Sequence, residues 1–299
     1  MGFEIGRYLI GQGYKVCAVR YNAHLQRAEH YVASNVEEFV ASMGSKYIQS
    51  YTVDGFKTVN RREKNLVTGT PCQIDSFRRY IRKFHCEDNF VLMDFFCHGV
   101  PSMHVWNKYI NEQRKQLGDI DYVAWRNKLN GWHDSWAMVL DGKKNKGETV
   151  DWHDSYNLLI REKKGFVNSR ATKGDTFYTM FFGNNCLGKA CYKYCKFKYD
   201  HSSADIRIGD MWGDTYAENE DGVTACVAFT QKGKDILENS NCEFKVHPFE
   251  TVAEGQIKQT IKYPFGWLLT ISTARLSLVS MKWLTLVSRV VGKINRTIR

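Results

Sequence analysis

Five cysteine side chains could together hold a metal centre. Cys186, Cys191 and Cys195 lie within ten positions, and Cys72 and Cys97 each follow an apolar run that predicts a strand. Four thiolates complete a structural zinc site or an iron–sulfur cluster, so this set leaves one thiol over. The order C-x4-C-x3-C within the first group matches neither a common zinc knuckle nor the usual ferredoxin run.

The segment TGTPCQ places Cys72 at the start of a predicted helix. Thr70 suits the N-cap, Pro71 the first helical position and Gln73 the third, which together form a capping box. The helix dipole and the free amides of a first turn favour a thiolate at Cys72. A strand-to-helix turn can also hold an anionic cofactor phosphate. The residues that we expect to contact such a cofactor are Thr68, Gly69, Thr70 and Gln73, with Gly99 from the next segment.

The segment DFFCHGVPS ends the next predicted strand with Cys97, His98 and Gly99. Gly99 permits close backbone approach, and Ser102 suits the cap of the following helix. His98, beside a thiol, is either a general acid or base near neutral pH, and thus the candidate catalytic residue, or a hydrogen-bond partner of a neighbouring loop.

The composition is that of a globular chain with a sizeable core. It has 299 residues, of which 43% are hydrophobic and 25% are charged. Nine cysteines is an odd number and the first residues show no secretory leader, so we expect reduced thiols and a cytoplasmic protein. The formal charge of +10 is spread along the chain without an arginine-rich tract. No nucleic-acid partner is therefore expected, whereas an anionic cofactor, an acidic electron-transfer partner or a membrane surface would suit this charge.

Alternating apolar runs and amphipathic segments predict an α/β fold with a mixed, partly parallel sheet and flanking helices. The expected strands are 14–19, 90–96, 205–209 and 223–230, and the expected helices are 3–12, 35–43, 74–84, 103–117 and 232–239. Cys17 and Cys226 lie in such apolar strands and are interpreted as core residues.

A polar turn, DGKKNKG, separates the similar segments GWHDSW and DWHDSY. This pattern predicts that 132–157 folds back as an antiparallel hairpin insertion. His133 and His153, one in each arm, are interpreted as strand residues rather than metal ligands, because paired aromatic strands need no metal.

The C-terminal segment differs from the rest in charge and hydropathy. Residues 267–299 contain no acidic residue, and their uncharged runs are too short to cross a membrane. Apolar residues recur there at helical spacing, at Leu276, Val279, Trp283, Leu286 and Val290. Such a helix either makes peripheral contact with an anionic membrane or packs against the protein or a partner subunit.

Several motifs, taken in order, give the chain a resemblance to a known family. They are QGYKVCAVRY, GSKYIQS, VTGTPCQIDSFRRYI, DFFCHGVPS followed by Trp106, the GW at 131–132, CYKYCKFK and SADIRIGDMWG. Over roughly residues 5–240 the chain resembles the beta subunits of coenzyme F420 hydrogenases and dehydrogenases. On this basis we expect a remnant of the family's N-terminal region at 1–62, its C-terminal domain at 63–245 and a basic helical tail at 246–299.

The resemblance implies an iron–sulfur flavoprotein that binds a [4Fe-4S] cluster and FAD. Its electrons would pass between a ferredoxin or ferredoxin-like subunit and a small-molecule redox substrate such as coenzyme F420. The cluster ligands would be a subset of the five cysteines, with Cys72 approaching Cys191 and Cys195 in space.

Two departures from the family pattern affect these expectations. The chain begins just after a Ser-Gly-Gly turn that the family has, which predicts weak flavin binding by this chain alone. The family's C-x2-C before KFK is C-x3-C here, so Cys186 is a candidate to replace one of that pair.

We therefore expect an iron–sulfur oxidoreductase of this beta-subunit type. The alternative is a zinc-stabilised, non-catalytic scaffold that binds RNA or another anionic polymer, and a third possibility is a redox-silent relative. The kind of metal bound discriminates between the first two.

Overall fold

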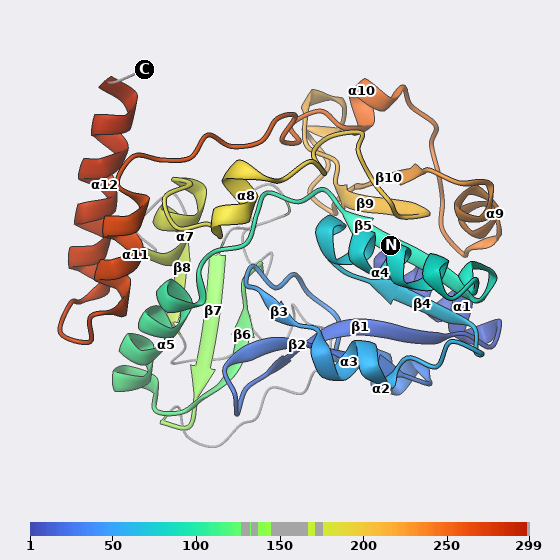
Figure 1. The fold of residues 1–299 in the computed structure, drawn as a ribbon, viewed down its shortest axis with the longest axis horizontal. Helices are drawn as coiled ribbons and strands as arrows, with labels where there is room; N and C mark the ends of the chain where they lie inside the picture. The colour runs from blue at the N-terminus through green and yellow to red at the C-terminus, as the bar shows by residue number, and fades with distance from the viewer. Residues whose placement is uncertain (127–131, 133–136, 145–166, 171–175, 298–299) are drawn as a thin grey trace.

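The computed structural model describes residues 1–126, 132, 137–144, 167–170 and 176–297 (Figure 1). Its strands are β1 Lys15–Asn22, β2 Arg27–Ala33, β3 Ser50–Tyr51, β4 Asn65–Thr68, β5 Phe90–Phe95, β6 Ile120–Ala124, β7 Ala137–Gly142, β8 Val167–Arg170, β9 Ile206–Asp210 and β10 Thr224–Ala228. Its helices are α1 Gly2–Gly11, α2 Val36–Val40, α3 Val53–Thr58, α4 Pro71–Lys83, α5 Met103–Leu117, α7 Thr176–Phe182, α8 Lys189–Lys193, α9 Gln231–Asn239, α10 Phe249–Val252, α11 Trp267–Arg275 and α12 Met281–Thr297.

The larger sheet has seven strands in the order β10-β9-β5-β4-β1-β2-β3. The central strands β1, β4, β5 and β9 run parallel, whereas β2 is antiparallel to β1 and β10 is antiparallel to β9. The predicted α/β class with a mixed, partly parallel sheet is therefore confirmed. Strands from the first sixty residues belong to the same sheet as later ones, since β1 pairs directly with β4.

Helices cover both faces of this sheet. Side chains alternate between the two faces of each strand, and the central strands carry apolar side chains on both faces. On one face, Leu66 and Val91 pack with side chains of α1, α2 and α9. On the other face, Val67 and Leu92 pack against α4. Both faces of the central strands are thus buried.

The local signals in the sequence place several elements correctly. Ser102 caps α5 by accepting a hydrogen bond from the backbone N–H of His104, and α5 ends at Leu117 before Gly118 at φ +75°. The predicted helices at 3–12 and 232–239 and the strands at 90–96 and 205–209 correspond to α1, α9, β5 and β9.

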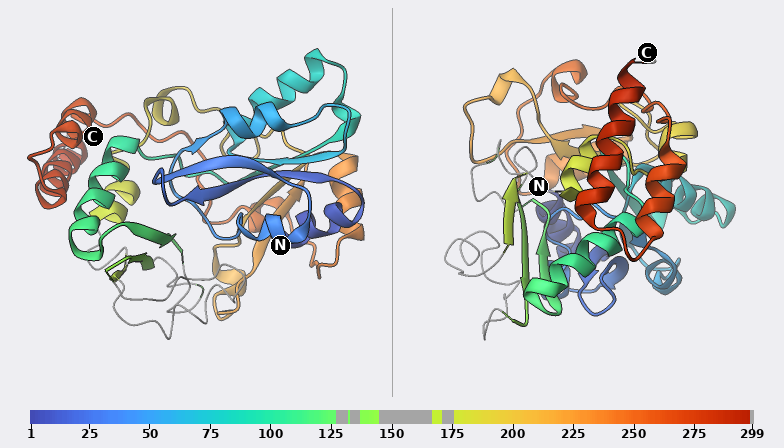
Figure 2. Two further views of the ribbon diagram at one scale, coloured as in Figure 1. Left: turned by 90° about the horizontal axis from the view of Figure 1, so that it is seen from below. Right: turned by 90° about the vertical axis from the view of Figure 1, so that its left-hand side faces the viewer.

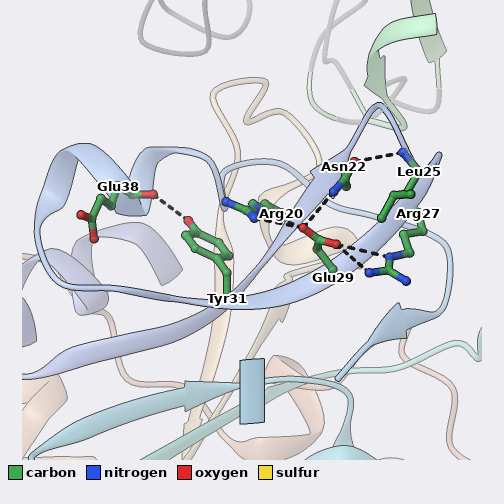
Figure 3. Close-up of polar contacts among 7 residues, drawn as sticks. All are labelled: Arg20, Asn22, Leu25, Arg27, Glu29, Tyr31 and Glu38. Atoms are coloured by element: carbon green, nitrogen blue, oxygen red, sulfur yellow. Dashed lines mark hydrogen bonds and ion pairs between the residues drawn. The ribbon is translucent and has the colours of Figure 1, made fainter. Parts of the chain in front are cut away.

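The β1–β2 hairpin is fixed by a polar network around the Glu29 carboxylate (Figure 3). Its Oε1 accepts hydrogen bonds from Arg20 Nη2 at 3.0 Å and Asn22 Nδ2 at 3.1 Å, and its Oε2 accepts one from Arg27 Nη2 at 3.2 Å. The turn of the hairpin contacts the rest of the protein through Gln26, whose Nε2 donates to the carbonyl of Ile120 at 2.8 Å. This bond joins the larger sheet to the smaller one.

A second core surrounds the smaller antiparallel sheet, β6-β7-β8. Aromatic side chains of α5 and α7 fill it, and α11 and α12 cover it on the outside (Figure 2). An antiparallel hairpin is present as the pair β7 and β8, but its second strand is 167–170, beyond the expected range of 132–157. The whole of the expected second arm, and both His133 and His153, lie outside the described residues.

Within the described part of the chain, no helix has both the length and the apolar content needed to cross a bilayer. The C-terminal segment packs on the protein through α11 and α12, which contact α5 and α7.

Candidate functional site

Two of the predicted thiols follow adjacent parallel strands. Cys72 comes after β4 and Cys97 after β5, and the two strands pair in parallel register from Asn65 opposite Phe90 to Thr68 opposite Met93. Carboxyl ends of neighbouring parallel strands lie at the same sheet edge, where α/β proteins commonly place their sites. The fold therefore brings these two segments together.

The predicted capping box at the start of α4 is confirmed. Gln73 Oε1 accepts a hydrogen bond from the backbone N–H of Thr70 at 2.9 Å, while Gln73 Nε2 donates to Ser50 Oγ at 3.0 Å. Thr70 Oγ1 lies 3.2 Å from Cys72 Sγ. The cap thus holds Cys72, which is exposed, in the first turn of the helix.

The polar groups of the TGTPCQ turn are used largely within the protein. The backbone N–H of Gly69 donates to the carbonyl of Met93 at 3.2 Å, and Thr68 Oγ1 donates to the carbonyl of Cys17 at 3.3 Å. Together with the Thr70 amide, these donors are already bonded within the protein. A cofactor contact at Thr68, Gly69, Thr70 and Gln73 stays a prediction.

A buried histidine that the sequence did not single out supports the same turn. His30, on β2, donates from Nε2 to the carbonyl of Thr68 at 3.0 Å, and only 3% of its surface is exposed. Burial lowers the pKa of His30 below its ordinary value of 6.5, against the opposing effect of its hydrogen bonds to backbone groups.

This depressed pKa predicts a loss of stability in acid. Below about pH 6.5 His30 takes up a proton in the unfolded chain but resists protonation in the folded protein. The contribution of the neutral His30 to the free energy of unfolding is therefore complete above that pH and is lost as the pH falls. The free energy of unfolding of the wild type should fall between about pH 7.5 and about pH 5.5 by more than that of His30→Gln, by up to about 1.4 kcal/mol per pH unit. Denaturant titration at both pH values measures this difference, and equal slopes would contradict the assignment.

The third thiol segment is attached to the Cys97 loop by backbone bonds. The N–H of Ser102 donates to the carbonyl of Cys186 at 2.7 Å, and the N–H of Gly188 donates to the carbonyl of Val100 at 2.8 Å. Gly99 lies at φ +138°, where a Cβ atom would come within 2.9 Å of Leu187 Cδ1 and 3.5 Å of Cys191 Cβ. Glycine is therefore required at this close approach for both conformation and space.

Four of the five thiols interact electrostatically. The pKa of Cys97 is raised to about 12, chiefly by burial, and the thiols of Cys191 and Cys72 also act to raise it. The pKa of Cys191 is also raised, first by burial and then by Cys195 and Cys72. The expected approach of Cys72 to Cys191 and Cys195 stays a prediction.

Two backbone N–H groups and one cation act to lower the pKa of these thiols. The amides of Gly99 and Val100 hydrogen-bond to Cys97 and Cys191 respectively, and each bond lowers the pKa of its thiol. The Lys198 ammonium lowers the pKa of both thiols. Donors of this kind stabilise thiolates, the form in which cysteine binds metal.

Lys198 is a buried cation that sequence inspection overlooked. Its Nζ donates to the carbonyls of Cys97 at 2.6 Å and His98 at 3.0 Å, and its exposed fraction is 6%. In the part of the chain that the structure describes, it forms no ion pair with a carboxylate. A buried charge is costly unless an opposite charge compensates it, and the thiolate groups around it could supply that charge.

The chemistry of the thiols can be compared with what a metal centre needs. Among the described residues, no three Cys, His, Asp or Glu side chains are grouped closely enough to hold one metal ion. A [4Fe-4S] cluster takes four thiolates, each bound to a different iron. Cys72, Cys97, Cys191 and Cys195 supply four thiols, and their role as cluster ligands stays a prediction.

Cys186 differs from these four thiols. It is completely buried in the second core, and burial alone raises its pKa to about 12. Its thiol interacts with Tyr192, and its carbonyl accepts a hydrogen bond from the Ser102 amide. These contacts are typical of a core residue.

His98 is tied to a neighbouring loop. Its Nε2 lies 2.7 Å from Asn184 Oδ1 and its ring lies 4.8 Å from that of Phe181. Burial lowers the pKa of His98, and the amide oxygen accepts the hydrogen bond from its Nε2. This geometry favours the hydrogen-bonding interpretation of His98, and its catalytic role stays a prediction.

A buried ion pair fixes the chain that follows Lys198. Arg207 on β9 bonds Asp94 on β5 through two hydrogen bonds of 2.7 and 2.8 Å, and both side chains are fully buried. The same guanidinium donates to the carbonyls of Tyr199 at 2.8 Å and His201 at 2.9 Å. The two strands pair in register at these residues, which places both side chains on one face.

A second polar and aromatic cluster joins the two sheets. Trp132 stacks on Trp212 with ring centroids 5.1 Å apart, and Arg126 forms an ion pair with Asp210. Arg126 also lies over the Trp212 ring at 4.9 Å. Two motifs noted in the sequence, GW and GDMWG, thus meet in space.

The fold is that of an α/β protein in which Cys72 and Cys97 follow adjacent parallel strands at one edge of a mixed sheet. The family model that describes the C-terminal part of the beta subunit in coenzyme F420 hydrogenases and dehydrogenases matches residues 62–251. The chain therefore belongs to this family and is an oxidoreductase of the F420 hydrogenase beta-subunit type.

Comparison with known structures gives a distant likeness in fold. A chain of the F420-reducing [NiFe] hydrogenase complex from Methanosarcina barkeri, solved with xenon, is 13% identical, with a TM-score of 0.49. The match covers 100% of this chain and 83% of that one. No curated protein matches the chain.

Proposed function

We propose that this chain is an electron-transfer oxidoreductase that holds a [4Fe-4S] cluster on Cys72, Cys97, Cys191 and Cys195. The observation that supports this proposal is that the buried Lys198 ammonium interacts with the thiols of Cys97 and Cys191, which in turn interact with those of Cys72 and Cys195. A cluster with four thiolate ligands is anionic overall and would compensate that cation. When bound, the cluster would supply one-electron transfer.

The residues of the chain would position and insulate this centre. The cap of α4 orients Cys72, and the backbone bonds between 100–102 and 186–188 orient Cys97 against Cys191. Exposure of Cys72 leaves one side open to solvent, where an electron donor could approach. An acidic ferredoxin or ferredoxin-like subunit suits a chain with a formal charge of +10.

The proposal also includes FAD, as the two-electron partner of the cluster, and coenzyme F420, as the acceptor. We assign no residue to either, because the donors of the TGTPCQ turn are bonded within the protein. Titration of the chain with FAD, and with a deazaflavin, tests this part separately from the cluster.

Anaerobic reconstitution tests the proposal as a whole. We expect four iron and four sulfide ions per chain, with visible absorption that dithionite bleaches. A colourless protein with one equivalent of zinc would instead support a scaffold.

Lys198 is predicted to raise the reduction potential of the cluster. Its charge stabilises the more negative, reduced state, and a unit charge within about 10 Å at an effective dielectric constant of about 20 is worth about 1.5 kcal/mol. In Lys198→Met the ratio of reduced to oxidised cluster at a fixed potential should fall about tenfold, which is about 59 mV for one electron.

The control is Lys198→Arg, which keeps the charge and should stay near the wild-type potential. Redox titration followed by electron paramagnetic resonance measures both variants at equal iron content. An unchanged potential in Lys198→Met would show that the cation does not face the cluster.

A further inference from the structure

The outer face of α12 is apolar although the fold does not bury it. Met281, Leu284 and Val291 face the protein and are at most 5% exposed. A second apolar set occupies another side of the same helix, at Trp283, Leu286, Val290 and Ile294. These positions recur every three or four residues and thus form one stripe.

Exposed apolar side chains are concentrated in this part of the molecule. Of the nineteen large hydrophobic side chains that are exposed among the described residues, ten lie between Tyr263 and Ile294. Leu278, in the turn between α11 and α12, is 99% exposed, and Trp283 is 64% exposed. In Figures 1 and 2 these two helices stand side by side at one edge of the molecule.

The charges around the stripe have one sign. Residues 255–299 contain eight lysine and arginine residues and no aspartate or glutamate. On α12, the exposed side chains of Lys282, Arg289 and Lys293 follow the helical spacing that places them along one flank of the stripe. An apolar face flanked by cations is the pattern of a helix lying in the surface of an anionic membrane.

A hollow beside the turn adds to this positive surface. A cavity of about 350 Å³ lies between α5 and the α11–α12 turn, and His104, Lys108, Lys115 and Arg275 are among its lining residues. Its carboxylate, Glu112, accepts a hydrogen bond from the backbone N–H of Met281 at 2.6 Å, at the first residue of α12. The Lys108 ammonium is bonded to the carbonyls of Leu276 and Val279, so the cations that the cavity offers next to the exposed Leu278 are Lys115 and Arg275.

We propose that the outer face of α12, with Leu278, binds the surface of a membrane that contains anionic lipids. Trp283, Leu286 and Val290 enter the interface between headgroups and acyl chains, and the basic flank contacts the lipid phosphates. This attachment is peripheral and does not depend on the cluster.

Flotation of the full chain with lipid vesicles tests the proposal. Binding is expected to vesicles of phosphatidylcholine with phosphatidylglycerol, to be weak with phosphatidylcholine alone, and to fall as salt is added. Combining Trp283→Ser, Leu286→Ser and Val290→Ser should lower the partition coefficient at least about tenfold. Replacement of Lys282, Arg289 and Lys293 by glutamine should lower it about fivefold per charge at low salt.

The matched control combines Phe244→Ser and Val246→Ser. These side chains are also exposed but lie away from α12, so binding should be unchanged. Circular dichroism and thermal unfolding check that every variant folds. Absence of binding to the anionic vesicles, or equal binding by the stripe variant, would overturn the proposal. Self-association of the wild type that the stripe variant abolishes, without vesicle binding, would assign the face to a protein interface instead.

Discussion

Cys191→Ser is expected to remove the iron–sulfur cluster, whereas Cys186→Ala is expected to leave it in place. Cys191 interacts with Cys97, Cys195 and Cys72, so its loss leaves three of four thiolates. Cys186 is buried in the second core and belongs to none of these pairs. Because the two residues lie on one short segment, the two variants differ mainly in whether the lost thiol is a proposed ligand.

Iron and acid-labile sulfide per chain, after anaerobic reconstitution, measure the outcome. We expect less than about a tenth of the wild-type content in Cys191→Ser and wild-type content in Cys186→Ala. Cys226→Ser, in strand β10, is a second control, because it removes a cysteine outside the proposed ligand set and should leave the iron content unchanged. Retention of iron by Cys191→Ser together with its loss from Cys186→Ala would reverse the ligand assignment.

Asp94→Asn is expected to destabilise the protein by about 3–5 kcal/mol, because it leaves the buried Arg207 guanidinium without its carboxylate. The double variant Asp94→Leu with Arg207→Met should lose less than the sum of the single variants, since it leaves no unpaired charge. The free energy of unfolding from urea titration measures these differences.

A surface pair provides the control for this experiment. Arg7 and Glu4 form an exposed salt bridge on α1, and Glu4→Gln should cost less than about 1 kcal/mol. If Asp94→Asn cost no more than this control, the buried pair would not be the element that fixes the two strands.

Loss of the pair should also affect the thiol site. Arg207 bonds the carbonyls of Tyr199 and His201, just after Lys198, so its removal loosens the segment that carries the cation.

The local elements of this fold were predictable because their signals lie within a few residues of one another. The capping box of α4 spans Thr70 to Gln73, and α5 lies between its cap at Ser102 and Gly118. The order of the strands and the three-stranded sheet were not predictable, because they depend on pairings between distant segments.

The same distinction applies to the site. The five cysteines are visible in the sequence, but the difference between Cys186 and the other four depends on which side of its loop faces the core. Lys198 and His30 acquire their roles only from carbonyls contributed by other segments.

The pair of Asp94 and Arg207 could have been found. Each is a single charge inside an apolar strand, in FVLMDFF and DIRIG, and two opposite charges that are both predicted to be buried are expected to pair.

Anomalous diffraction at the iron edge, from crystals of the anaerobically reconstituted chain, tests the central claim most directly. The account predicts four iron atoms bonded to the sulfur atoms of Cys72, Cys97, Cys191 and Cys195, with Lys198 Nζ beside them and Cys186 unligated. Iron bound to Cys186 in place of one of these thiols, or a single zinc ion among them, would contradict it.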